Sequence, residues 1–311
     1  MTTSEAAAIT TAWSAAIRAH VRANATAAAG FAVALAVVVV LLGQSLVDLV
    51  RGEASDGFRL GLLGGCAGFA ATAIGALPAL AMRTMPQKLS DVMLGAAAGM
   101  MLAASAFSLI LPGLEAGATI AGTRPLGALV VVAGMALGVL LMLGLDEFTP
   151  HAHDETGPCG PGAANCGRIW LFVFAIALHN LPEGMAIGVG FSHADMSVGL
   201  PLTSAIAIQD MPEGLAVALA LRGAGYSAVR SVALAVLTGL LEPIGAIIGV
   251  GLSGGLAVAY PMGLGIAAGA MLFVVSHEVI PETHRNGHQT PATIGLMGGF
   301  ALMMVLDTTL G

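Results

Sequence analysis

The chain has 311 residues, of which 57% are hydrophobic and 9% are charged, and its formal net charge is −7. A soluble domain carries roughly 25% charged residues, so this composition excludes a soluble globular protein and predicts an all-α polytopic membrane protein. Half of the acidic residues lie inside apolar segments rather than on a solvated face, so the net charge says little about partners. We expect the lipid bilayer as a partner and no nucleic acid.

The N-terminal segment, residues 1–27, carries Arg18 and Arg22 ahead of an apolar run from about Ala25 to Val50. That run is much longer than the 7–15 residues of a signal-peptide core. We therefore expect an uncleaved transmembrane helix at 28–50.

Eight further apolar segments follow, each long enough for a spanning helix, which needs about 20 residues. They lie at 60–83, 91–113, 125–146, 168–193, 199–222, 229–251, 257–280 and 290–310. The separators carry turn-forming residues. The long polar loop at 147–167 is rich in Gly and Pro, and we expect no folded domain there.

The basic residues predict the orientation, because cytoplasmic loops of membrane proteins carry an excess of Lys and Arg. With the N-terminus in the cytoplasm, most basic residues fall on the cytoplasmic side. The cytoplasmic set is Arg18, Arg22, Arg83, Lys88, Arg168, Arg222, Arg230 and Arg285, against Arg51, Arg59 and Arg124 outside. This places the C-terminus outside and the 147–167 loop in the cytoplasm.

The three cysteines indicate no disulfide framework. Cys66 lies in an apolar segment, whereas Cys159 and Cys166 lie in the 147–167 loop. Their odd number, and the absence of a C-x-x-C pattern from the sequence, predict free thiols rather than a zinc ribbon.

Two related polar motifs interrupt neighbouring apolar segments: "HNLPEG" at His179–Gly184 and "QDMPEG" at Gln209–Gly214. The carboxylates near mid-span are Glu183, Asp210, Glu213 and Glu242. An ionised carboxylate at that depth is unfavourable by about 2.5–3.5 kcal/mol, and the sequence has no Lys or Arg at comparable depth. The acids must therefore be protonated or hold cations.

The spacing of these residues favours one shared site. The two motifs are equally distant from the turn near residue 196, so they should meet at one level of the membrane. His179 and Glu183 form an i,i+4 pair on one helix face, and Gln209 and Glu213 repeat that spacing. Further candidate ligands beside these pairs are Asn180, Asp210 and, on a third helix, Glu242. Each motif glutamate can then reach two adjacent sectors of the site, and each sector is a candidate position for one cation.

Pro182 and Pro212 should kink their helices, and Gly184 and Gly214 permit close helix approach. Carboxylates and amides alone suit Ca²⁺ or Mg²⁺, whereas imidazole favours Zn²⁺, Fe²⁺, Mn²⁺ or Cd²⁺. Two divalent cations would balance four carboxylates. We predict these ions as cargo, and no cofactor. Met101, on a neighbouring helix, is left open between a ligand and a core residue.

At these motifs the sequence resembles the ZIP (Zrt/Irt-like) divalent metal transporters, and closely their bacterial GufA-like branch. The resemblance covers about residues 60–311, an eight-helix core, and leaves the 28–50 helix as an addition. It implies uptake of divalent transition metals into the cytoplasm, and we expect zinc as the first of these ions and the bacterial inner membrane as the location. It implies a binuclear centre, with Met101, His179, Glu183, Gln209 and Glu213 at one metal and Asn180, Glu183, Asp210, Glu213 and Glu242 at the other.

The sequence departs from the pattern of the family in two places. Gln209 stands where many relatives have His, so their metal preference does not carry over. The cytoplasmic loop holds only two histidines, His151 and His153, which makes it poor for metal sensing. The one protein partner considered is a second copy of the chain, in a homodimer.

A route from the centre to the cytoplasm is also expected. On a rise of 1.5 Å per residue, His277 and Glu278 lie roughly 16 Å closer to the cytoplasm than Glu242 does. Together with Asp146, His151 and His153 they form the predicted exit pathway.

An intramembrane metal-dependent protease is the alternative from another class. It needs H-E-x-x-H, and in "HEVIPETH" Pro281 stands where the second His should be. "GLSGG" at 251–255 joins two membrane helices rather than a strand and a helix, so we treat it as chance. A proton-driven carrier of an organic substrate is a second alternative. We predict a transporter and no enzyme.

Overall fold

The computed structural model describes residues 55–148, 151–153, 157–159, 168–253 and 257–311, together with 18–25 and scattered positions up to Arg51. The predicted helix at 28–50 therefore lies largely outside the described residues, as does most of the predicted 1–27 segment.

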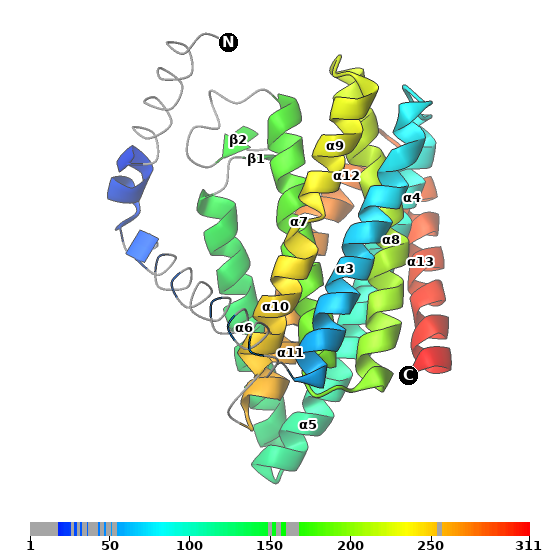
Figure 1. The fold of residues 1–311 in the computed structure, drawn as a ribbon. Helices are drawn as coiled ribbons and strands as arrows, with labels where there is room; N and C mark the ends of the chain where they lie inside the picture. The colour runs from blue at the N-terminus through cyan, green and yellow to red at the C-terminus, as the bar shows by residue number, and fades with distance from the viewer. Residues whose placement is uncertain are drawn as a thin grey trace.

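Long helices running up and down make up the molecule (Figure 1). In chain order they are α3 (Asp56–Ala76) with η1 (Leu77–Leu80), α4 (Gln87–Ala104), η2 (Ser105–Ile110), α5 (Leu111–Ala121), α6 (Arg124–Phe148), α7 (Arg168–Phe191), α8 (Met196–Gly223), α9 (Ala228–Thr238), α10 (Leu241–Ser253), α11 (Ala259–Val274), η4 (Val275–Val279), α12 (Ile280–His284) and α13 (Gln289–Leu310). Within the described part of the chain, seven spans are long and apolar enough to cross a membrane. The 24-residue α7 is not one of these seven, but it packs against α3, α8, α10 and α11 in the same bundle. The predicted all-α polytopic membrane fold is confirmed.

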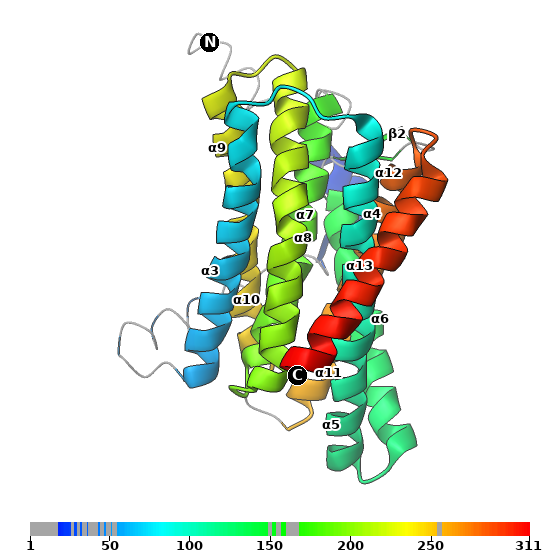
Figure 2. The same cartoon turned by 90° about the vertical axis from the view of Figure 1, so that its right-hand side faces the viewer.

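The helices form two groups. In the first, α3 and α7 contact each other, and each packs against both α8 and α10. In the second, α13 lies along α4, and α11 packs against both α5 and α6. Contacts of α4 with α8 and of α7 with α11 join the groups (Figure 2). We call the end with residues 81–86, 224–227 and 285–288 the upper end, as in Figure 1, and the end with the C-terminus the lower end.

The predicted span at 91–113 is too short. Helical backbone continues from Gln87 to Ala121, because Pro112 stands at the start of α5 rather than ending the helix. The preceding six residues, Ser105–Ile110, are π-helical. A π-turn adjusts the backbone ahead of a proline that has no N–H to donate. The same arrangement recurs at η4, which precedes Pro281.

The predicted span at 229–251 is present as Ala228–Ser253, but its helix is interrupted near the middle, since α9 ends at Thr238 and α10 begins at Leu241. Pro243 falls in the first turn of α10, where its missing N–H breaks no helical hydrogen bond. The division places Glu242 in that same first turn. The partial positive charge of a helix N-terminus favours a carboxylate there.

The 147–167 loop contains one element that the sequence did not predict. Residues His151–His153 (β1) pair antiparallel with Gly157–Cys159 (β2), and β1 contacts α7 near the upper end. The side chains of both strands lie outside the described part of the structure. Cys66 is a free, exposed thiol on α3, as predicted.

Candidate metal centre

The two polar motifs lie in the middle of two adjacent antiparallel helices. His179–Gly184 belongs to α7 and Gln209–Gly214 to α8, and each helix continues through its internal proline. The motif glycines bring a third and a fourth helix close. A Cβ on Gly184 would collide with the backbone of Glu242 on α10, and one on Gly214 would collide with the backbone of Thr72 on α3. Four helices, α3, α7, α8 and α10, therefore meet at the motifs.

Every carboxylate of the predicted centre is buried. Glu183 and Glu242 are 0% exposed, Asp210 is 1% exposed and Glu213 is 3% exposed. The remaining members of the centre, His179, Asn180 and Gln209, are also buried. Among the described residues, no Lys or Arg is buried. The negative charges of this layer are therefore not neutralised by a basic side chain.

Side chains of the two motifs contact one another directly. Gln209 Nε2 donates a short hydrogen bond to Glu183 Oε1. His179 Nδ1 lies 3.6 Å from Glu213 Oε1, which is too long for a hydrogen bond. One carboxylate oxygen each from Glu183, Asp210 and Glu213 lies within 4.8 Å of the other two. The three oxygens are thus close enough together to bind a common cation.

The polar atoms of this layer are poorly satisfied within the protein. In the described part of the chain, eleven buried side-chain N and O atoms have no hydrogen-bond partner, and most of them belong to this layer. These are His179 Nδ1 and Nε2, Asn180 Nδ2, Glu183 Oε2, Gln209 Oε1, both Asp210 oxygens, Glu213 Oε2 and Glu242 Oε2. Buried polar groups are nearly always paired in proteins, and unpaired buried charges are unfavourable by several kcal/mol.

A divalent cation would resolve both problems. It would neutralise the acids and use their free lone pairs, and the two nitrogens of His179 offer the imidazole ligand that zinc accepts. The carboxylates carry four negative charges when ionised, which equal the charge of two divalent ions. The donor set therefore fits a two-metal centre on both charge and ligand chemistry.

Glu242 is held by a residue that the sequence did not point to. Thr72 Oγ1 donates to Glu242 Oε1 over 2.7 Å, from the neighbouring helix α3. A single threonine in an apolar helix usually bonds to its own helix backbone, so the sequence carries no signal for this contact.

Met101 is 1% exposed and belongs to a hydrophobic cluster with Met100, Met271 and other apolar residues. The structure thus places it in the core on α4. Its sulfur as a metal ligand stays a prediction.

Three of the five predicted exit residues lie together. Asp146 on α6 and His277 and Glu278 in η4 offer ligand atoms within 4.8 Å of one another. A cavity of about 10 Å³, on the order of one water, is lined by His179, Asp146 and Glu278 among others. It therefore adjoins both the buried layer and this cluster. The side chains of His151 and His153 lie outside the described part of the structure.

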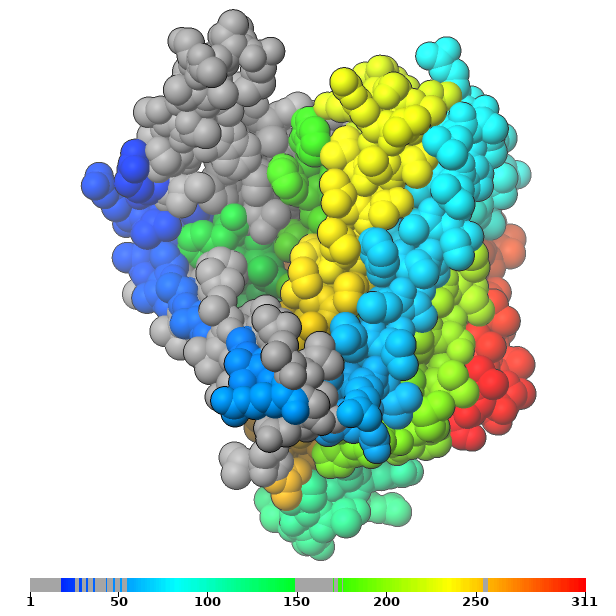
Figure 3. Space-filling view, in the orientation of Figure 1, coloured from blue at the N-terminus to red at the C-terminus, as the bar shows by residue number. Residues whose placement is uncertain are grey.

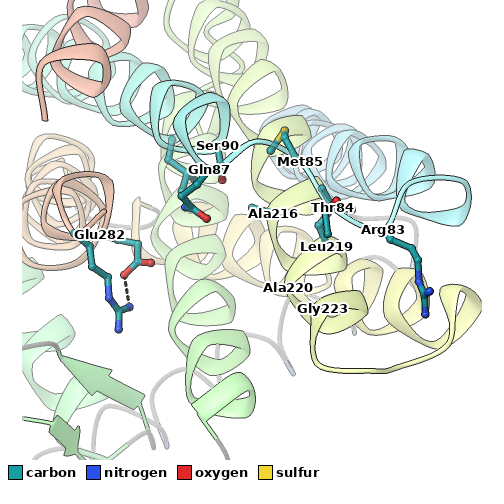
Figure 4. Close-up of a pocket in the computed structure, with 12 residues that line it drawn as sticks. Arg83, Thr84, Met85, Gln87, Ser90, Ala216, Leu219, Ala220, Gly223 and Glu282 are labelled. Carbon is teal, nitrogen blue, oxygen red and sulfur yellow. Dashed lines mark hydrogen bonds and ion pairs between the residues drawn. The ribbon is translucent and has the colours of Figure 1, made fainter. Parts of the chain in front are cut away.

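A larger cavity of about 500 Å³ opens at the upper end between α4 and α8 (Figure 4). Its lining residues include Arg83, Gln87, Leu219 and Glu282, and Glu282 pairs with Arg285 over 3.0 Å. The lining includes no residue of the two motifs, so this cavity is separate from the candidate metal centre.

The fold and the centre together define a polytopic membrane protein with a cation-binding layer inside its helix bundle. The family model of the ZIP Zinc transporter matches residues 161–307. This segment contains both motifs, Glu242, His277 and Glu278, whereas Asp146 lies before it.

Relatives match most of the chain. Zinc transporter ZIPB of Bordetella bronchiseptica is 60% identical over 282 residues, which cover 91% of each protein. Zinc transporter GufA of Myxococcus xanthus is 44% identical and covers 78% of this chain and 95% of its own length. Zinc transporter ZIP11 of Bos taurus is 32% identical over 77% of this chain and 94% of its own. The chain belongs to the ZIP family, and to its bacterial GufA-like branch. The predicted resemblance is confirmed, and because these proteins are transporters the protease alternative finds no support.

Proposed function

We propose that this protein is a secondary transporter that carries divalent transition metal ions, zinc first, through a binuclear centre at mid-membrane. The observation that supports this most strongly is the buried layer of carboxylates whose oxygens have no partner in the protein. The names of the most similar relatives, all zinc transporters, support zinc as the cargo. Cd²⁺, Fe²⁺ and Mn²⁺ accept the same mixture of carboxylate, amide and imidazole ligands and are proposed as further cargo.

The ligands divide between two metals. His179 and Gln209 serve the first, with Met101 from α4, whereas Asn180, Asp210 and Glu242 serve the second. Glu183 and Glu213 bridge them, and each has an oxygen with no hydrogen-bond partner. Gln209 Oε1 and Glu183 Oε2 have no hydrogen-bond partner, so both can bind metal while the hydrogen bond from Gln209 Nε2 to Glu183 Oε1 orients the two side chains.

The exit pathway leads from His179 towards the upper end. The small cavity between His179 and Glu278 adjoins both the centre and the cluster of Asp146, His277 and Glu278. An ion that leaves the first metal position meets a second set of carboxylate and imidazole ligands there. Because these residues are partly exposed, water competes more strongly for the ion and favours its release. His151 and His153 are proposed to follow as the last ligands.

We place the upper end in the cytoplasm of a bacterium and the protein in the inner membrane. The basic residues support this, since Arg83, Lys88, Arg222, Arg230 and Arg285 all lie at or near the upper end. Transport from the lower to the upper end is then import. The exposed apolar faces of α6 and α13 are assigned to the bilayer or, in a homodimer, to a second copy.

Purified protein in liposomes that contain a zinc-sensitive dye tests the proposal. External zinc should raise the dye signal with wild-type protein and not with empty liposomes. A wild-type protein that moves no divalent metal under any imposed proton gradient would refute the function. Transport of an organic substrate instead would favour the competing carrier.

A further inference from the structure

Thr72 lies on α3 and belongs to neither polar motif. Its Oγ1 lies 2.7 Å from Glu242 Oε1 and 3.4 Å from the carbonyl oxygen of Gly68. A hydroxyl has one proton to donate, and the shorter contact to a carboxylate makes the stronger hydrogen bond. Thr72 therefore donates across to α10 rather than to its own helix.

This hydrogen bond is shielded from water. Thr72 is 2% exposed and Glu242 is 0% exposed. The helices α3 and α10, which pack together, cover this face of the bundle side by side (Figure 3). No solvent competes for either partner, and a hydrogen bond to an ionised group is strong in such surroundings.

The backbone positions of both partners are set by the motif glycines. A Cβ on Gly184 would lie 2.0 Å from the carbonyl oxygen of Glu242, and a Cβ on Gly214 would lie 2.2 Å from the carbonyl oxygen of Thr72. Real side chains do not tolerate such distances to backbone atoms. Each motif therefore places one member of the Thr72–Glu242 pair at close range.

The hydrogen bond leaves the other carboxylate oxygen available. Glu242 Oε2 has no hydrogen-bond partner and lies against Gly68, where a Cβ would collide with it. The same Cβ position lies 3.2 Å from Asp210 Oδ2. Glu242 Oε2 and Asp210 Oδ2 therefore share a small space on the α3 side of the centre, which stays open because residue 68 has no side chain.

We propose that Thr72 is a positioning residue for the second metal: its hydroxyl holds Oε1 of Glu242 and so leaves Oε2 to bind the cation together with Asp210. The proposal rests on the proposed function, because it requires a metal bound by Glu242. Thr72 itself does not touch the ion. It sets the orientation of a ligand, as hydrogen-bonding partners of metal ligands commonly do.

Zinc titration of the purified, full-length protein tests the proposal. Thr72→Val removes the hydroxyl at nearly constant volume and should weaken binding of the second zinc ion about 10- to 100-fold, as loss of such partners usually does. Binding of the first zinc ion should not change. Thr72→Ser, which restores a hydroxyl, should recover the wild-type affinity. Thr283→Val is the matched control, because this buried threonine donates to the Ile280 carbonyl oxygen on α12.

Several outcomes would overturn the proposal. They are unchanged affinity in Thr72→Val, loss of both zinc ions, and failure of Thr72→Ser to restore binding. In a Glu242→Ala background, where only the first zinc ion is expected to bind, Thr72→Val should leave the affinity for that ion unchanged, and a loss there would mean that Thr72 acts through another group. If the wild-type protein bound fewer than two zinc ions, the binuclear centre itself would be wrong, which separates failure of the proposed function from failure of this inference.

Discussion

Gln209 on α8 donates a hydrogen bond to the carboxylate of Glu183 on α7, which joins the two polar motifs across the centre of the bundle. The contact shows that the helices hold the motifs face to face. It also means that Glu183 has one satisfied oxygen and one without a partner. A cation can therefore bind to a carboxylate that is already oriented.

Removal of a bridging acid should abolish both metal binding and transport. In the proposed centre, Glu183→Ala and Glu213→Ala would each remove one ligand from both metals. Without metal, the free energy of unfolding of the variants should equal or exceed that of the wild type, because a buried ionised carboxylate at mid-membrane is unfavourable by about 2.5–3.5 kcal/mol. Dye-loaded liposomes and thermal unfolding measure the two effects. Glu282→Ala, which removes an acid paired with Arg285 at the upper end, is the control. Undiminished uptake by Glu183→Ala would refute the assignment.

Removal of a ligand from the second metal alone should leave one metal in place. Glu242→Ala and Asp210→Ala delete a charge and a ligand from the sector on the α3 side, whereas His179, Gln209 and both bridging acids remain. We expect one bound zinc ion per chain and reduced but measurable transport. Metal counting by mass spectrometry of purified protein decides the matter. Two ions, or none, would contradict the division into sectors.

His277→Ala should slow the release of zinc without emptying the centre. His277 lies with Asp146 and Glu278 beyond the small cavity, away from the four central acids. The rate at which a chelator removes bound zinc should fall, while stoichiometry stays at two. His193→Ala is a matched control at the lower end, where His193 stacks on Tyr260 with ring centroids 4.3 Å apart. A centre that loses its zinc in His277→Ala would show that the assigned route is wrong.

The motif glycines should tolerate no side chain. Gly184→Ala would force a methyl group into the backbone of Glu242, and overpacking of this kind lowers the free energy of unfolding by about 1–3 kcal/mol. The displacement of Glu242 should also weaken binding of the second metal. Gly298→Ala is the control, because nothing lies within 4 Å of its Cβ position on α13, and alanine favours a helix by about 0.5–1 kcal/mol. Equal thermal stability of the two variants would contradict the close approach of α7 and α10.

The upper end should be inaccessible from outside the cell. In a protein whose Cys66, Cys159 and Cys166 are replaced by serine, Ala224→Cys reports the upper end and Thr123→Cys the lower end. Both positions are exposed. A membrane-impermeant maleimide should label Thr123→Cys in intact cells and label Ala224→Cys only after lysis. The reverse pattern would invert the proposed direction of transport.

The spans and the motifs were predictable because they depend on local patterns. Apolar runs of membrane-crossing length gave the helices, and the i,i+4 spacing of His179 with Glu183 placed two ligands on one face. Helix boundaries were less predictable. Pro112 reads as a helix end, yet the π-helical turn before it lets the backbone continue to Ala121. The division between α9 and α10 was missed because Gly239 and Pro243 lie inside an otherwise apolar run.

Thr72 could not be found from the sequence. Its hydroxyl carries no charge, so nothing in an apolar helix marks it as costly, and its partner Glu242 lies 170 residues away in the chain. Only the packing of α3 against α8 and α10 brings the two side chains together. Residues that hydrogen-bond to a metal ligand are generally hard to predict from sequence, since their position depends on tertiary contacts rather than on spacing within one helix.

Anomalous scattering at the zinc absorption edge, from crystals of the zinc-loaded protein, locates the bound ions and their ligands together. We predict two zinc peaks inside the bundle, both in contact with Glu183 and Glu213. One peak should also contact His179 and Gln209, and the other should contact Asp210 and Glu242. Zinc peaks confined to the cluster of Asp146, His277 and Glu278, with none in the buried layer, would contradict the binuclear centre.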